Sequence, residues 1–272
     1  MHYFYTKGCE FLNRLDKEER IINEFQLLNS HEVGLFPENV QTRRIYKHIN
    51  NANNWKKWID TSAKNDLPPD FYNDKLKLMM DVMRIDDHAF VDEKGRVINR
   101  HNERESQLIE ELIRKNEIFK CLAESGNVFI TPDSGLRGYE DHNYNFYVEN
   151  FKRVVGKHIK KIEKYKKNHP GFKTIFFVFD ESSPYIKCFD EKRTTLVGES
   201  VFAQPHFWWL DNNMMKVIKD SNIDYLIWMC PYKYFRAEIE LNFPVAMIYD
   251  VQKINYSSFI NYENKDMQSL EL

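Results

Sequence analysis

Apolar residues recur along this chain with two different periods, which predict both helices and strands. In the first 70 residues the period is helical, because the apolar positions between Asp16 and Leu28 share one stripe and Val40 to Ile49 repeats it. Leu67-Pro68-Pro69 interrupts this pattern, since proline lacks a backbone donor and disfavours helix in the preceding residue. We therefore expect a helical N-terminal extension or subdomain over residues 1–70.

From residue 71 onward, short apolar runs alternate with amphipathic stretches. The runs expected to be strands are 76–85 (LKLMMDVMRI), 127–131 (NVFIT), 174–179 (TIFFVF), 225–229 (YLIWM) and 245–249, with a hairpin over 89–98. Alternation of this kind predicts an α/β fold with a mixed, partly parallel sheet flanked by helices. We expect this domain to span residues 71–262 and the polar residues 263–272 to form a frayed tail.

The longest expected helix covers residues 147–167. Its apolar positions form one continuous face, made of Tyr147, Phe151, Val154, Val155, His158, Ile162 and Tyr165. Its polar side is basic, and such a stripe can contact the phosphates of a nucleic acid. The candidate nucleic-acid-binding residues are Lys157, Lys160, Lys161 and Lys164. A solvated outer face is the alternative interpretation.

Composition narrows the class of protein. Hydrophobic residues make up 42% of the 272 residues and charged residues 29%, which is a globular balance. The net charge of −2 produces no global attraction to nucleic acid or anionic membrane. The four cysteines are far apart, so neither a disulfide framework nor a zinc finger is expected. Since neither a signal-peptide pattern nor a membrane-length apolar run is present, we expect a cytoplasmic protein without membrane contact.

Acidic residues follow several of the expected strands. Asp86-Asp87-His88 follow the first strand, Asp133 follows the second, and Asp180-Glu181 follow the third. The carboxyl ends of parallel strands share an edge, where open α/β sheets bind ligands. Lys233, after the strand at 225–229, would join them. Carboxylates that converge repel one another unless a cation lies between them, and Mg²⁺ and Mn²⁺ prefer such oxygen ligands.

These positions predict a divalent-metal site with Mg²⁺ or Mn²⁺ as cofactor. The candidate metal ligands are Asp86, Asp87, Asp133 and Asp180, and the candidate catalytic residues are Asp180, Glu181, Lys233 and His88. Because such an ion activates water and neutralises phosphoryl charge, the predicted function is a nuclease-like phosphodiester hydrolase. Two alternatives stay open: an interaction or regulatory module whose acids are turn residues, and a nucleotide or small-molecule binding domain without a metal.

Two further features bear on this hypothesis. Pro132-Asp133 followed by the pair Asp180-Glu181 partly resembles the pattern of restriction-endonuclease-like nucleases. That family has a lysine two residues after the second acid, where this chain has Ser182, so membership is not inferred. Asp81 and Arg84 lie inside the first apolar run, where they would either pair with each other or face the site.

Overall fold

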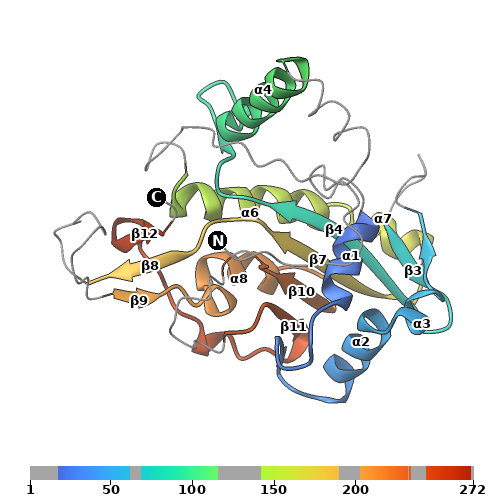
Figure 1. The fold of residues 1–272 in the computed structure, drawn as a ribbon. Helices are drawn as coiled ribbons and strands as arrows, with labels where there is room; N and C mark the ends of the chain where they lie inside the picture. Colours follow the sequence, from blue (N-terminus) through green and yellow to red (C-terminus); the bar gives the residue numbers. More distant parts are fainter. Residues whose placement is uncertain are drawn as a thin grey trace.

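A computed structural model describes residues 18–61, 69–115, 142–189, 203–231, 233 and 243–270. Over these ranges the fold is mixed α/β, as predicted, with helices packed against a central sheet (Figure 1). The strand expected at 127–131 and the candidate ligand Asp133 lie outside the described residues.

The central sheet has seven strands in the order β1-β11-β10-β7-β4-β3-β2. Their bounds are β1 Val33–Phe36, β2 Ile59–Asp60, β3 Phe71–Asn73, β4 Leu78–Ile85, β7 Lys173–Asp180, β10 Tyr225–Met229 and β11 Ala246–Asp250. The neighbours β4, β7 and β10 are parallel, as the alternating pattern predicted. β3 and β11 run antiparallel to them, and β1 is parallel to β11.

The remaining strands form two small sheets. They are β5 Phe90–Val91 and β6 Val97–Ile98 in the expected hairpin, and β8 Tyr185–Cys188, β9 Ala203–Pro205 and β12 Met267–Ser269 in a sheet of order β12-β8-β9. At the hairpin turn Gly95 has a φ of +76°, a conformation that glycine adopts without steric cost. The hairpin predicted over 89–98 is therefore confirmed.

Helices cover both faces of the central sheet. Their bounds are α1 Glu18–Gln26, α2 Val40–Asn50, α3 Ala52–Trp55, α4 Arg100–Lys115, α6 Tyr144–Ile159, α7 Ile162–Asn168 and α8 Asn212–Lys219, with 3₁₀ turns η1 Trp208–Leu210, η2 Val251–Lys253, η3 Tyr256–Ser258 and η4 Asn264–Asp266. α1 and α2 pack on one face, and α6, α7 and α8 pack on the other. None of the helices in the described ranges is long and apolar enough to cross a membrane.

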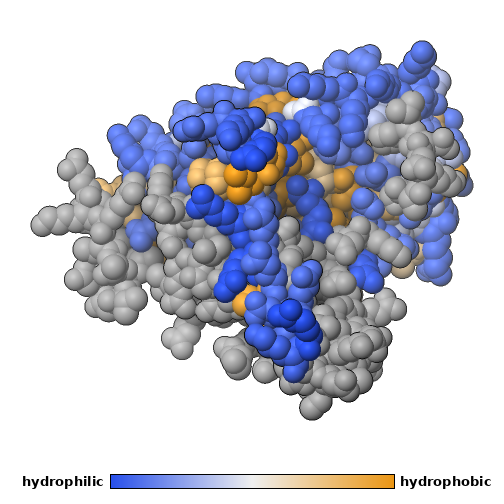
Figure 2. Space-filling view, turned by 90° about the horizontal axis from the view of Figure 1, so that it is seen from above, coloured by the Kyte–Doolittle hydropathy of each residue, from blue (hydrophilic) through white to orange (hydrophobic). Residues whose placement is uncertain are grey.

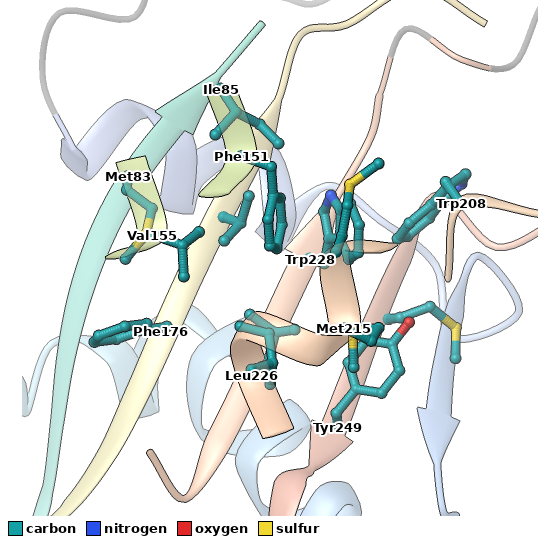
Figure 3. Packing of buried hydrophobic residues seen from close by; sticks show 14 of the residues in the cluster. Met83, Ile85, Phe151, Val155, Phe176, Trp208, Met215, Leu226, Trp228 and Tyr249 are labelled. Atoms are coloured by element: carbon teal, nitrogen blue, oxygen red, sulfur yellow. The ribbon is translucent and has the colours of Figure 1, made fainter. Parts of the chain in front are cut away.

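The larger core lies under α6, α7 and α8. Figure 3 shows Phe151 and Val155 of α6 pointing toward the side chains of the sheet. The ring centroids of Phe151 and Trp228 are 4.9 Å apart, and those of Trp208 and Trp228 are 5.1 Å apart. Because β7 and β10 are buried on both faces, their sequences are continuous apolar runs without alternation.

The helix expected over 147–167 is two helices rather than one. α6 ends at Ile159 and α7 begins at Ile162. The Lys161 amide donates at 2.9 Å to the carbonyl of His158, three residues before it. An α-helix bonds residues four apart, so the chain makes a tighter, 3₁₀-like turn here. The apolar stripe continues across this break, so its spacing alone could not reveal the interruption.

Both ends of the chain contribute more to the sheets than was expected. The first 70 residues supply not only helices but also β1 and β2, which lie at the two edges of the central sheet. The expectation of a frayed tail is wrong for residues 267–269, since β12 pairs antiparallel with β8. Met267 is buried in the larger core, and its burial holds this segment in place.

Candidate functional site at the carboxyl ends of the parallel strands

β4, β7 and β10 end at the same edge of the central sheet. Ile85 pairs in register with Asp180, and Met229 pairs with Phe179, so the residues that follow each strand are neighbours. The Glu181 amide also donates to the Ile85 carbonyl at 2.9 Å. This edge therefore holds Asp86, Asp87, His88, Asp180, Glu181 and Lys233. Although they share an edge, their side chains enter four different networks.

Asp180 is fully buried on the side of α6. Its Oδ2 accepts hydrogen bonds from the Tyr147 hydroxyl at 2.5 Å and from the Trp228 indole at 2.9 Å. Its Oδ1 accepts from the amide and hydroxyl of Ser182. The Cys230 thiol lies 3.2 Å from Oδ2. Donors thus surround both oxygens, and a metal ion could bind here only by displacing them.

Lys233 completes this network. Its ammonium lies 3.3 Å from Asp180 Oδ2, donates to the Tyr147 hydroxyl at 2.7 Å and sits 4.0 Å from the centre of the Tyr147 ring. The lysine side chain is only 4% exposed, so the ion pair is buried. A pair of this kind costs desolvation and is retained where both charges have partners. It ties the loop after β10 to α6 and to the end of β7.

The charge states in this network follow from burial and from its neighbours. Burial by itself would raise the pKa of Asp180, but the Lys233 ammonium and the donors on Ser182 and Tyr147 outweigh it and hold that pKa below its usual value. Burial and the Asp180 carboxylate raise the pKa of Tyr147 well above its usual value, and they do the same to the Cys230 thiol. Cys230 is therefore an inert thiol rather than a nucleophile.

Asp87 belongs to a second network, between β4 and β8. Its Oδ2 accepts from the Ser183 amide at 3.0 Å and from the Tyr185 hydroxyl at 2.6 Å. Its Oδ1 is buried and has no hydrogen-bond partner among the described residues. His88 Nε2 lies 3.7 Å from this oxygen, and the His88 ring is 5.1 Å from the ring of His142. Asp87 Oδ1 is thus a candidate to bind a further group.

Asp86 shapes the loop after β4. Its Oδ1 accepts from the amides of His88 and Ala89, its Oδ2 accepts from Asn99, and Asn150 donates to both its carbonyl and its Oδ1. This is the turn role that was weighed against metal binding. Through Asn150, the loop is attached to α6.

Glu181 points toward the opposite face of the sheet. It forms a bidentate ion pair with Arg84, with nitrogen–oxygen distances of 2.7 to 3.1 Å. Both side chains are about a quarter exposed. Glu181 was predicted to be catalytic, but this ion pair engages its carboxylate and turns it away from Asp180.

Sequence reasoning missed a fifth network, which lies next to the edge. Asp211 caps α8, and its Oδ2 also accepts from the Tyr144 hydroxyl at 2.6 Å and is 2.8 Å from His206 Nε2. Burial lowers the pKa of His206 although Asp211 opposes this effect, so the ring is neutral at pH 7. The tyrosines on the apolar face of the helix could have indicated this network from the sequence, because a buried tyrosine hydroxyl needs a hydrogen-bond partner.

No group of three His, Cys, Asp or Glu side chains in the described parts of the chain is arranged to hold a metal ion. The physical reason is that the three predicted ligands within the described ranges point in different directions: Asp86 into its turn, Asp87 toward β8 and Asp180 toward α6. The described residues therefore do not form a ready-made Mg²⁺ or Mn²⁺ centre.

The predicted basic stripe lies on the outer side of α6 and α7. Lys157, Lys160 and Lys164 are exposed, and Lys161 is half-buried next to the break between the helices. Lys152 and Arg153 extend the stripe toward the first turns of α6.

A search with protein-family models, curated proteins and solved structures found no match for this chain.

Proposed function

We propose that the protein binds a nucleic acid along α6 and α7 and brings its phosphodiester backbone to the carboxyl-terminal edge of the sheet. The main observation in support of this proposal is that a row of exposed basic residues ends beside the acidic loop after β4. Asn150 makes this connection, because its side chain lies on α6 and donates to Asp86 at 2.9 and 3.1 Å.

The charges of the stripe are available to a ligand. Lys152 pairs with Glu149, whereas the ion pairs found among the described residues do not include Lys157, Lys160 or Lys164. The stripe runs over residues 153–164 of α6, α7 and the turn between them. At the rise of an α-helix these twelve residues cover about 18 Å, which is long enough to follow several phosphates. Lysines in this arrangement contact phosphates and release counterions from the nucleic acid.

A salt titration tests this proposal. Binding of a fluorescein-labelled single-stranded (dT)₁₂ is followed by anisotropy at several salt concentrations, for the wild type and for a variant with Lys157, Lys160, Lys161 and Lys164 changed to Gln. We expect the variant to bind at least tenfold more weakly at 100 mM salt. The slope of log K against log salt should fall by about 3, because each lost single-strand contact removes roughly 0.7.

The matched control has Arg44, Lys47, Lys56 and Lys57 changed to Gln, which removes the same charge from exposed positions on and next to α2, on the opposite face of the sheet from α6 and α7. This control should bind like the wild type. Equal losses in the two quadruple variants would show that only net charge matters, and they would refute the proposed site.

Hydrolysis of the bound phosphodiester with Mg²⁺ or Mn²⁺ is a second proposal. It is favoured by Asp87 Oδ1, which is buried and without a hydrogen-bond partner among the described residues, next to His88. A buried carboxylate oxygen without a donor is costly, and a cation would relieve that cost. The residues described here supply too few ligands by themselves, so the proposal requires others, for which Asp133 is the candidate.

A thermal-shift titration tests the metal proposal. At a concentration 100 times its dissociation constant, an ion would add about 2.7 kcal/mol to the free energy of unfolding. We expect Mn²⁺ to raise the Tm of the wild type by roughly 5 °C or more, and Asp87→Asn to abolish this shift. The exposed residue Asp74, changed to Asn, is the control. Absence of any shift in the wild type with either ion would dismiss the metal-dependent hydrolase.

A further inference from the structure

A cleft of about 430 Å³ lies between the β5–β6 hairpin and the first turns of α6. It is lined by Ala89, Phe90, Val91, Asn145, Phe146, Glu149, Asn150, Lys152 and Arg153. Seen from the side on which α4 lies, the coloured part of the surface is mostly hydrophilic, with an apolar area near the middle of the view (Figure 2). The volume is in the range of pockets that hold a small organic ligand.

Two aromatic rings form one part of the lining. Phe90 and Phe146 are stacked, with ring centroids 5.1 Å apart and an angle of 18° between the rings. Both side chains are half-buried and reach the cleft. A packed pair holds its rings in a fixed orientation, so a planar ligand can stack on it with little loss of side-chain entropy.

Basic and amide groups form the other part. Arg153 contacts the Oδ1 of Asn150, whose side chain is buried and anchored on Asp86. Lys152 lies next to it, and the exposed Asn145 can both donate to and accept from a polar ring edge. An arginine at this place can bind phosphate through two parallel hydrogen bonds.

This combination matches one unit of a nucleic acid strand: a planar base attached to a phosphate. The cleft also continues into the basic stripe, since Lys152 and Arg153 belong to both. Bases inside a duplex are stacked on their neighbours and cannot enter such a cleft without being flipped out. Single strands offer their bases freely, and aromatic residues next to a basic groove are their usual binding platform.

We propose that the cleft binds one unpaired base of a single-stranded nucleic acid, stacked on the Phe146 ring, which Phe90 supports from its other side, with its phosphate at Arg153. This inference rests on the proposed function and makes it more specific, because the basic stripe by itself does not distinguish single strands from other polyanions.

Two labelled probes of equal length and charge test the cleft: (dT)₁₂ and a 12-mer in which every residue is abasic. Phe146→Leu keeps an apolar side chain but removes the ring. We expect it to weaken the binding of (dT)₁₂ about tenfold, the effect of one lost base stack, and to leave the abasic probe unchanged. Phe146→Tyr, which keeps the ring, should bind both probes like the wild type.

Leu27→Ala, an exposed apolar position on the opposite face, is the folding and surface control. The quadruple lysine variant should weaken the binding of both probes. If that variant has no effect on either probe, the proposed function is refuted. If it weakens both while Phe146→Leu changes the two probes equally or not at all, the cleft inference fails and the basic stripe stands. Equal affinity of the wild type for a 12-base-pair duplex would also overturn the inference.

Discussion

Asp81 shows how far a residue's surroundings can depart from what its sequence neighbours suggest. It lies in the middle of the apolar strand β4 and is 2% exposed. Its Oδ2 contacts His158 Nδ1 and accepts from the Tyr165 hydroxyl at 2.9 Å. The pairing with Arg84 considered from the sequence does not occur, because residues three apart in a strand face opposite sides of the sheet. Arg84 pairs with Glu181 instead.

Asp70 lies next to Asp81, and its shifted pKa makes the stability of the fold depend on pH. Its Oδ2 accepts from the Val82 amide at 2.7 Å. Burial, together with the neighbouring Asp81 carboxylate, raises the pKa of Asp70 to about 8. A carboxyl group whose folded-state pKa is raised stabilises the fold most below its unfolded pKa, and this contribution is lost as pH rises toward 8.

Asp70→Asn tests this pH dependence, since asparagine keeps the acceptor for Val82 and cannot ionise. We expect the wild type to lose stability relative to the variant between about pH 4, the usual pKa of an unfolded aspartate, and about pH 8, by at most roughly 1.4 kcal/mol per pH unit. Urea unfolding of both proteins at several pH values measures the difference. A difference that is constant across this range would show that Asp70 is ionised throughout.

At the scale of elements, helix caps define where several helices begin. Asn39 caps α2 by accepting from the amides of Gln41 and Thr42, and the Thr42 hydroxyl accepts from the Asn39 amide in return. Asn39 also donates to Asp250 at the end of β11 at 3.2 Å. The cap thus fixes both the start of α2 and its attachment to the sheet.

Asn39→Ala removes the bonds made by the Asn39 side chain and should lower the free energy of unfolding by about 1 kcal/mol, which corresponds to a fall in Tm of roughly 2–4 °C. Asn39→Ser restores a capping oxygen and should recover most of that loss. Differential scanning calorimetry of the three proteins measures both values. The role given to the cap would be wrong if alanine and serine gave the same Tm.

The break between α6 and α7 is the element-scale feature that periodicity could not predict. Val155 and Ile162 are seven residues apart, a spacing that fits one continuous helix as well as two helices in line. The interruption depends on a single tightened turn at Lys161. It leaves the basic stripe on one side of the molecule, which the binding proposal requires.

At the scale of the whole molecule, the central sheet collects strands from distant parts of the chain. β1, from the first 40 residues, lies beside β11, from residues 246–250. Connections of this kind cannot be read from local patterns, because β1 is only four residues long and depends on its partner for stability. Its place at the edge of the sheet was therefore not predicted.

The amino-acid sequence by itself determined the α/β class, the central strands β4, β7 and β10, and the gathering of polar residues where those strands end. It could do so because strands buried on both faces are largely apolar whatever packs against them, and in β4 only Asp81 and Arg84 interrupt the run. The direction of each polar side chain was decided only by the tertiary structure. Asp180 meets Tyr147 and Lys233 while Glu181 meets Arg84, since adjacent residues face opposite sides and their partners come from segments far away in the chain.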